Sequence, residues 1–407
     1  MRHSATSLPP AVGLPDEARQ TSLTTPQICF VGLQNLPVLS PRYSAHGIGG
    51  EEVQQTLLAR ALKRRGFGVS MVVADYGQPD GEPMEGIELF KAHRLDGGIP
   101  VLRFIHPRFT GLWRALRRAN ADVYYVSIAG PQLGFVALFA LLHGRRVVFR
   151  IAHDADCDPA RSLIRFARDR WLYAFGLRHA AVRLAQTDQQ VRAMQDHYGL
   201  SSRVASMLVE PGGPWRPFDQ RDIDVLWVAN LVPLKRPRLV LDLARRSPGL
   251  RVHMVGGKQP GHERLFEEVA AEARSLPNLT FHGRLPYRHA NELFDRARVL
   301  VSTSELEGFP NVYLQAWRRG TPIVTFFDPD RVVARHGLGV TVASMGALAE
   351  EANRLARSPQ DWLVAGARCR EFMDEHHGED AVLAPYVQSL APAHVPTQHQ
   401  QPPCGET

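Results

Sequence analysis

The chain has 407 residues, which is too many for one ordinary hydrophobic core and therefore predicts two domains. Its composition, 44% hydrophobic and 22% charged, is typical of a globular protein and excludes a disordered chain. The net charge of +7 and the isoelectric point near 9.5 favour an anionic partner: a phosphorylated ligand, an acidic membrane surface or a nucleic acid.

The ends of the chain and the cysteines bear on its location. Residues 1–26 lack the apolar core of a secretory signal, and we expect a disordered lead there and a disordered, Pro- and Gln-rich tail over 391–407. No apolar run has the length of a membrane span; the most hydrophobic one, 133–142, is expected to be a buried helix. The cysteines have no metal-ligand spacing, which indicates free thiols in a reducing, cytoplasmic compartment.

The first half of the chain alternates strands and helices. A strand over 28–33 is followed by the Gly-rich stretch HGIGGEE, a helix over 51–65 with apolar residues at helical spacing, and a strand over 69–74. The alternation continues to about residue 209, with predicted strands at 122–128, 146–152 and 181–187 and predicted helices at 131–142, 160–177 and 188–198. Such alternation predicts an α/β domain with a parallel sheet, here a Rossmann-like domain over 27–209.

A segment rich in Pro and Gly, 210–222, predicts a linker, after which the alternation restarts. The second Rossmann-like domain is predicted over 223–376, including a strand at 298–304 and a long helix at 348–375. A last helix, 377–390, is expected to pack back on the first domain.

Three strand-to-helix junctions carry residues suited to an anionic ligand. Gly49 and Gly50 precede a helix start, where free backbone N–H groups favour an anion, although a plain Gly-rich turn explains them equally well. Lys235 stands at such a junction in the second half, where a cation can meet a diphosphate or simply be solvated. Glu307 follows the 298–304 strand, and Gln315 is eight residues further on, so one cleft can receive both side chains.

The stretch SELEGFPNVYLQAW, residues 304–317, resembles the E-x7-E motif of the retaining glycosyltransferases of family 4. The stretches GGEEVQQTLLARALKRRGFGVSMVV and WVANLVPLKRP resemble the family's first Gly-rich loop and its phosphate-binding segment, in the same order. The resemblance covers about residues 27–390. It implies the GT-B fold, in which two Rossmann-like domains face each other across a cleft, and a nucleoside diphosphate sugar as co-substrate, with no cofactor and no metal.

The resemblance also implies a role for each matched position. Lys235 would neutralise the diphosphate leaving group, and Glu307 would hold the donor sugar. His153, at the end of the fourth strand of the first domain, would meet the transferring sugar. The donor-binding residues would be Gly49, Gly50, Asn230, Arg284, Gly308, Phe309, Pro310, Asn311 and Gln315, with Arg284 at the base and Gln315 at the ribose.

Two positions depart from the family's pattern. Asn230 stands where many members have a phosphate-binding Arg, so more of the leaving-group charge would rest on Lys235. Gln315 replaces the second Glu; an amide still exchanges hydrogen bonds with a ribose hydroxyl, so we do not interpret it as inactivating. Asp154 and Asp156 form a D-x-D pair, a pattern that chelates metals in another glycosyltransferase fold but arises easily by chance.

The expected function is transfer of a sugar, with retention, to an acceptor hydroxyl of a glycan or lipid-linked acceptor, in cell-surface polysaccharide or glycolipid synthesis. The alternatives are a nucleotide-sugar epimerase, an inactive nucleotide-sugar-binding assembly protein and, weakest, a nucleic-acid binder, for which no module is recognisable. Trp113, Arg114, Arg117 and Arg118 could press on an anionic bilayer, which would make the enzyme peripheral on the inner face of a membrane. A helix with a buried apolar face and a solvated basic face explains the same residues.

Overall fold

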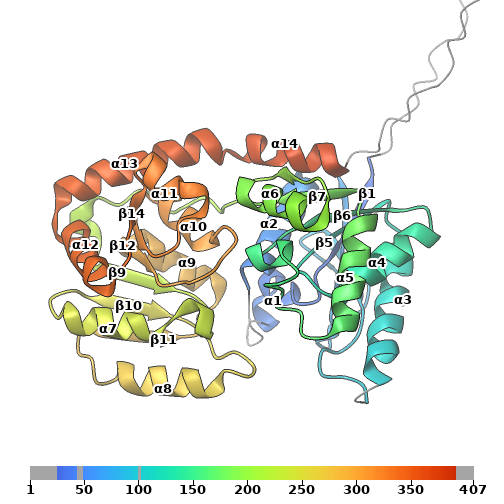
Figure 1. The fold of residues 1–407 in the computed structure, drawn as a ribbon, viewed down its shortest axis with the longest axis horizontal. Coiled ribbons are helices and arrows are strands. Elements are labelled where there is room, and N and C mark those ends of the chain that lie inside the picture. The colour runs from blue at the N-terminus through green and yellow to red at the C-terminus, as the bar shows by residue number, and fades with distance from the viewer. Residues whose placement is uncertain (1–24, 44–48, 100–101, 391–407) are drawn as a thin grey trace, which may run out of the picture.

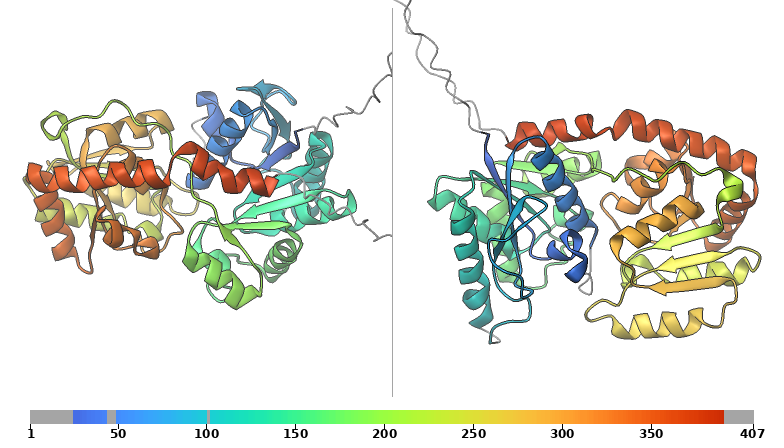
Figure 2. Two further views of the ribbon diagram at one scale, coloured as in Figure 1. Left: turned by 90° about the horizontal axis from the view of Figure 1, so that it is seen from above. Right: turned by 180° about the vertical axis from the view of Figure 1, so that it is seen from behind.

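The structure is a computed structural model that describes residues 25–43, 49–99 and 102–390. The predictions for 1–26 and 391–407 fall, apart from residues 25 and 26, outside the described residues. Two sheets with helices on both faces lie side by side (Figures 1 and 2). This confirms the predicted α/β fold with two Rossmann-like halves. Among the described helices, none combines the length and the apolar character needed to cross a membrane.

The first sheet has eight strands in the order β3-β4-β2-β1-β5-β6-β7-β8, parallel except for the β3–β4 pair. Its strands are β1 (Gln27–Val31), β2 (Gly68–Val73), β3 (Pro83–Met84), β4 (Ile87–Lys91), β5 (Val123–Ser127), β6 (Arg146–Arg150), β7 (Val182–Ala185) and β8 (Arg203–Val204). The accompanying helices are α1 (Leu36–Leu39), α2 (Gly50–Arg64), α3 (Thr110–Ala119), α4 (Pro131–Leu142), α5 (Ala167–His179) and α6 (Asp188–Tyr198). The predicted helix over 160–177 is seven residues off at its start, because 158–166 forms an irregular segment.

The second sheet has six parallel strands in the order β11-β10-β9-β12-β13-β14. They are β9 (Ile223–Val228), β10 (Val252–Val255), β11 (Leu279–Gly283), β12 (Ala297–Ser302), β13 (Ile323–Thr325) and β14 (Gly339–Thr341). The helices are α7 (Arg238–Arg246), α8 (Glu263–Ala273), α9 (Tyr287–Arg296), α10 (Asn311–Arg318), α11 (Val332–His336), α12 (Met345–Arg357), α13 (Pro359–His376) and α14 (Glu379–Leu390). The predicted single helix over 348–375 is wrong: Pro359 cannot continue α12, and the Ser358 hydroxyl caps a new helix.

Both sheets change direction at one point in their strand order. In the first sheet the chain starts at β1 and winds outward through β2 and β4, then returns to the other side of β1 with β5; the second sheet repeats this with β9 and β12. Within the second sheet the central register sets Leu226 of β9 beside His253 of β10 and Leu300 of β12. Loops that follow the two central strands lie at the carboxyl edge, where open parallel sheets bind ligands.

Each sheet is packed on both faces by apolar side chains. One core of the first half is formed by alternate residues of its central strands, such as Ile28 and Phe30, with α2, and Val382, Leu383 and Tyr386 of α14 pack into that same core. The hydroxyl of Tyr386 donates to the carbonyl of Ser206 at 2.9 Å. The terminal helix therefore follows the second half in the chain but packs against the first (Figure 1).

Candidate active site

A cavity of about 320 Å³ lies between the two halves at the carboxyl edges of both sheets. Its volume is within the range of small-molecule sites. The first half contributes the start of α2 and the ends of β6 and β7; the second contributes the segments after β9, β10, β11 and β12. The cavity is lined by these residues predicted from the sequence: Gly49, Gly50, Asn230, Lys235, Arg284, Glu307, Gly308, Phe309, Pro310, Asn311 and Gln315.

Lys235 and Glu307 form a direct ion pair in this cavity, from Nζ to Oε1. Lys235 ends the short helical turn η6 (Pro233–Lys235) after β9, and Glu307 follows β12, so the pair lies at the point where the strand order of the second sheet reverses. Both side chains are partly buried. A cation and a carboxylate 72 residues apart thus meet at the edge where open parallel sheets bind ligands.

The start of α2 is shaped by two glutamates. Glu52 is buried and folds back toward Gly49, so any side chain on Gly49 would collide with the Glu52 carboxylate. Burial raises the pKa of Glu52 to about 7, although hydrogen bonds from its own N–H and that of Gly49 oppose the rise. The N-terminus of this helix therefore carries a carboxyl group that loses much of its charge near neutral pH, which lessens repulsion of an anion there.

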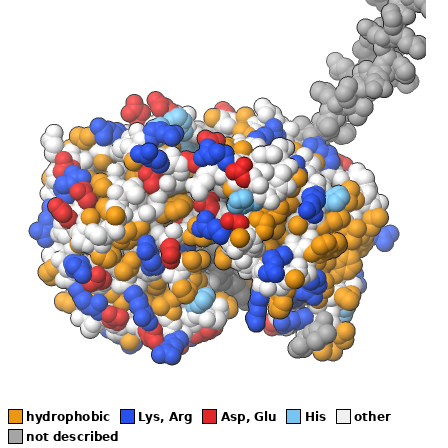
Figure 3. All heavy atoms as spheres, in the orientation of Figure 1, with side chains coloured by type: hydrophobic (Ala, Val, Ile, Leu, Met, Phe, Trp, Pro, Cys, Tyr) orange, Lys and Arg blue, Asp and Glu red, His pale blue; other side chains and the backbone are white. Residues whose placement is uncertain are grey.

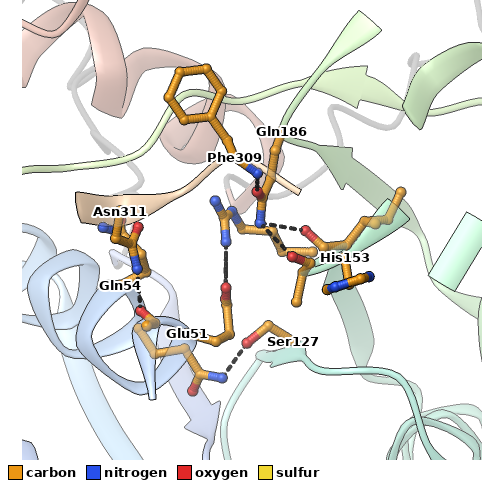
Figure 4. Close-up of polar contacts among 12 residues, drawn as sticks. Glu51, Gln54, Ser127, His153, Gln186, Phe309 and Asn311 are labelled. Carbon is orange, nitrogen blue, oxygen red and sulfur yellow. Dashed lines mark hydrogen bonds and ion pairs between the residues drawn. The ribbon is translucent and has the colours of Figure 1, made fainter. Parts of the chain in front are cut away.

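Glu51 pairs with Arg150 beneath the cleft. The Arg150 Nη1 contacts both carboxylate oxygens of Glu51, at 3.0 and 2.7 Å, and the arginine is almost completely buried. Burial is the largest single influence and lowers the pKa of Arg150, but the charge of Glu51, its hydrogen bond and the nearby Tyr386 and Tyr125 together raise that pKa overall. The pair ties the first turn of α2 to the end of β6 (Figure 4), which fixes the Gly49–Gly50 backbone against the sheet.

Hydrogen bonds connect the halves across the cleft. The Phe309 N–H donates to the side-chain oxygen of Gln186 at 2.6 Å, and the Asn311 side chain donates to the carbonyl of Gly50 at 2.7 Å. Gln186 in turn donates to the carbonyls of Ile151 and Ala152, at 3.0 and 3.2 Å. Figure 4 shows the Gln186 side chain pointing toward Phe309. The backbone N–H of Phe309, a residue that the resemblance assigns to donor binding, is thus already hydrogen-bonded.

Gly308 makes this approach possible. A Cβ at this position would lie 2.7 Å from both the Ala152 carbonyl oxygen and the Gln186 side-chain oxygen. Real side chains do not tolerate such a distance, so a residue larger than glycine would hold the halves apart.

The remaining predicted residues of the second half lie in the cavity wall. Gln315 is 9% exposed and donates from Nε2 to the Tyr287 hydroxyl at 3.2 Å. Asn230 accepts a hydrogen bond from Gln259 at 2.9 Å. Arg284 donates to the Lys258 carbonyl at 2.5 Å and lies over Gly257, where a Cβ would come within 2.6 Å of the guanidinium.

His153 borders the cavity without lining it. Its ring accepts a hydrogen bond from the Ala155 N–H at 3.3 Å, which caps the turn η4 (Asp154–Cys157). Burial lowers its pKa, while the charge of Glu307 and a hydrogen bond to the Leu306 backbone oppose that shift. The ring is therefore neutral at neutral pH and held near Glu307.

The carboxylates of Asp154, Asp156 and Asp330 accept hydrogen bonds from within the protein. Asp156 accepts from the N–H groups of Ala152 and His153, and Asp154 accepts from Gln190. Asp330 accepts from the first N–H groups of α6, those of Asp188 and Gln189, at 2.7 and 3.2 Å, which adds a third link between the halves. Among the described residues, no group of three or more His, Cys, Asp or Glu side chains is placed to hold a metal ion.

Sequence reasoning missed Gln186, Tyr287 and the Arg150–Glu51 pair. Gln186 follows β7 directly, and its position at a strand's carboxyl end was a usable signal. Tyr287 begins α9 and has no such signal in the sequence.

Two family models match the chain in succession. Residues 49–212 match the glycosyl transferase 4-like domain, and residues 216–360 match the glycosyl transferases group 1 model. The chain is a glycosyltransferase of the group 1 type. This membership makes it an enzyme and replaces the alternatives of an epimerase, an assembly protein and a nucleic-acid binder.

The glycosyltransferase is similar to known proteins at two levels. Over 190 residues it is 29% identical to D-inositol 3-phosphate glycosyltransferase of Mycobacterium tuberculosis, and this match spans 43% of the chain and 38% of the relative. Among solved structures, sucrose-phosphate synthase from Thermosynechococcus elongatus has a TM-score of 0.69 at 16% identity, covering 89% of this chain and 98% of that one. Anabaena HepE in complex with UDP and glucose has a TM-score of 0.68 at 15% identity, covering 90% and 99%. These likenesses establish the GT-B fold.

Proposed function

We propose that the enzyme transfers a sugar from a nucleoside diphosphate sugar to an acceptor hydroxyl, with retention of configuration at the anomeric carbon. The observation that carries the proposal is the Lys235–Glu307 ion pair, placed at the strand-order reversal of the second sheet and inside the cavity. Structures of HepE, which has the same fold, were solved with UDP and with UDP-glucose, which supports a donor of this class.

The proposed chemistry follows from the charges in the cavity. When the bond between the anomeric carbon and the diphosphate breaks, negative charge grows on the leaving oxygen, and the Lys235 ammonium group stabilises it. Donor entry therefore exchanges the Lys235–Glu307 ion pair for contacts with the donor: Lys235 turns to the diphosphate and Glu307 accepts from sugar hydroxyls. In the closed cleft the Phe309 N–H stays bonded to Gln186, so Glu307 carries the contact with the donor sugar.

We propose that retention arises from departure and attack on the same face of the sugar. The acceptor hydroxyl then approaches beside the leaving diphosphate, which accepts its proton. His153, neutral and next to Glu307, is suited to orient the sugar. Closure of the halves through Gln186 and Asn311 excludes water and favours transfer over hydrolysis.

The acceptor we propose is a glycan or a lipid-linked sugar, used in cell-surface polysaccharide or glycolipid synthesis at an anionic membrane face. The basic character of the chain supports an acceptor of this kind. No metal takes part in the proposed reaction, so EDTA should leave turnover unchanged.

A thermal-shift screen with UDP-, GDP-, ADP- and dTDP-sugars tests the donor, since a bound donor raises the apparent stability. The donor that shifts the midpoint is then incubated with candidate acceptors, and the anomeric configuration of the product is read by NMR. A donor sugar altered without any acceptor, or a product of inverted configuration, would contradict the proposal.

A further inference from the structure

Large apolar side chains are exposed on one face of the first half. Leu142 on α4 is 67% exposed, Leu163 before α5 is 64% exposed and Trp171 on α5 is 65% exposed. Figure 3 shows hydrophobic side chains gathered over α4 and α5. The prediction that 133–142 is a buried helix is therefore right for one side of α4 only: Leu133 is fully buried, whereas the outward side meets solvent.

The exposed side chains belong to elements that pack on one another. Helices α4 and α5 cross closely, with Gly134 against the backbone of Leu172. The short helical turns η2 (Leu102–Phe104) and η3 (Ile105–Phe109) join them: the Phe104 ring lies 5.3 Å from the ring of Phe135 on α4 and 3.3 Å from the Arg168 guanidinium on α5. We call this surface the α4–α5 face; its exposed apolar residues are Leu102, Ile105, Leu138, Leu141, Leu142, Leu163, Phe166 and Trp171.

The part of the chain that carries these apolar side chains is rich in arginine, although buried members such as Arg150 lie away from this face. Residues 97–187 contain fourteen arginines and no lysine against five aspartates and no glutamate, an excess of nine positive charges that is larger than the +7 of the whole chain. Arg103 and Arg165 are exposed on the same segments as Leu102 and Phe166. A surface that offers apolar side chains among arginines matches the acyl chains and phosphates of an anionic bilayer. Two copies of the chain would instead bring like charges together.

Helix α3, which the sequence suggested for contact with a bilayer, does not provide the apolar side chains of this face. Trp113 on α3 packs against Phe139 and His143 of α4, with ring centroids 5.0 and 5.7 Å apart, and Arg118 pairs with Asp80. Trp113 therefore belongs to the packing beneath the surface, and the apolar contact falls to α4, α5 and their neighbours.

We propose that the α4–α5 face docks on a bilayer that contains anionic phospholipids. The segment 158–166 runs from η4, beside the cleft, to α5, so a docked enzyme has its cleft near the lipid surface. The inference rests on the proposed function in one respect: a lipid-linked acceptor would reach the cleft from the membrane. Binding of the enzyme to the bilayer requires no substrate.

Sedimentation of the full chain with vesicles tests this proposal. We expect binding to vesicles of phosphatidylcholine with phosphatidylglycerol, weakening as salt rises, and little binding to phosphatidylcholine alone. Replacing Leu142 and Leu163 together by Ser should lower the association constant for these vesicles by about tenfold or more. The matched control replaces Leu363 and Val364 on α13, 46% and 47% exposed, by Ser and should bind like the unaltered enzyme.

A second pair of variants isolates the charge. Arg103→Ser with Arg165→Ser should weaken binding and flatten its salt dependence, whereas Arg264→Ser on α8 should change neither. The proposal is overturned if the unaltered enzyme does not bind to anionic vesicles. It is also overturned if the unaltered enzyme is a dimer and the Leu142 and Leu163 variant is a monomer. The thermal shift caused by the donor is measured on the same variants. If these variants lose vesicle binding but keep donor binding, this surface is separate from the active site. Each of the two proposals can therefore fail without the other.

Discussion

Gln186 of the first half accepts a hydrogen bond from the backbone N–H of Phe309 in the second half, at 2.6 Å. The same glutamine donates to two carbonyls at the end of β6, so it is fixed on one side of the cleft and reaches the other. A closed cleft in this protein is thus held by a contact that uses a backbone group of the loop that we propose to bind the donor. We therefore expect this amide to link donor binding to closure.

Removing this contact should affect turnover more than donor affinity. In Gln186→Ala the Phe309 amide is free for the donor, while closure loses a buried hydrogen bond, so we expect kcat to fall about tenfold with the donor Kd unchanged or lower. Calorimetry gives the Kd and product formation gives kcat. Gln189→Ala, in which an exposed side chain at the start of the following helix α6 is removed, is the control. A Kd that rises while kcat stays constant would contradict the coupling.

Loss of either member of the Lys235–Glu307 pair should remove most activity. For Lys235→Ala and Glu307→Gln we expect kcat/KM to fall about a hundredfold. The first variant leaves the charge on the leaving group without its cation, and the second leaves the sugar hydroxyls without a charged acceptor. The double variant should cost much less than the product of the single effects, since the two groups act together. Lys258→Ala, whose exposed ammonium pairs with Glu267, serves as control. Near-complete activity in Lys235→Ala would remove the basis of the proposed function.

Gln315 tests whether the departure from the E-x7-E motif matters. Its Nε2 donates to the Tyr287 hydroxyl, and a carboxylate can accept from that hydroxyl instead, so Gln315→Glu should keep activity within a few-fold. In Gln315→Ala the ribose and Tyr287 both lose a partner, and we expect the donor KM to rise about tenfold with kcat little changed. Initial rates against donor concentration separate the two parameters. A dead Gln315→Glu enzyme would show that the amide itself is required.

His377 should make folding stability depend on pH. It is buried between α13 and α14, with its Nδ1 3.2 Å from the Met207 carbonyl oxygen, and burial lowers its pKa from 6.5 to about 4. Between these values the unfolded chain binds a proton that the folded chain does not, so stability is complete above pH 6.5 and is lost as the pH falls toward 4. The loss at pH 4 is about 3 kcal/mol at most.

Urea titrations at several pH values check this contribution. His377→Asn should lower stability at neutral pH and flatten its decline between pH 6.5 and 4. Gln195→Ala, which removes an exposed side chain without a titratable group from α6, should leave the slope as it is. An equal slope in both variants would assign the pH dependence to other groups.

Much of the site follows from sequence because its residues come directly after strands. Lys235 follows β9 and Glu307 follows β12, and adjacent parallel strands present their carboxyl ends at one edge. Their contact also depends on β9 lying next to β12 in the sheet, which the strand order determines and no local pattern shows. The motif resemblance supplied that information.

The features that local patterns did not show involve the other half of the molecule or the solvent. Gln186 gains its role from Phe309, more than a hundred residues away, and nothing near it in the sequence indicates this partner. The apolar run of α4 indicates a helix that avoids water, but not that Leu141 and Leu142 lie outside the core. Periodicity indicates the shape of an element; burial depends on what packs against it.

The position of α14 also limits how this enzyme can be recombined with its relatives. The helix completes the core around Ile28 and Leu62, although it is encoded after the whole second half. Cutting the chain within 210–222 would leave the first half with an open apolar surface and the second with a detached amphipathic helix. A chimaera that exchanges the donor half should therefore insert the foreign segment between the linker and residue 377, and keep the native C-terminal helix.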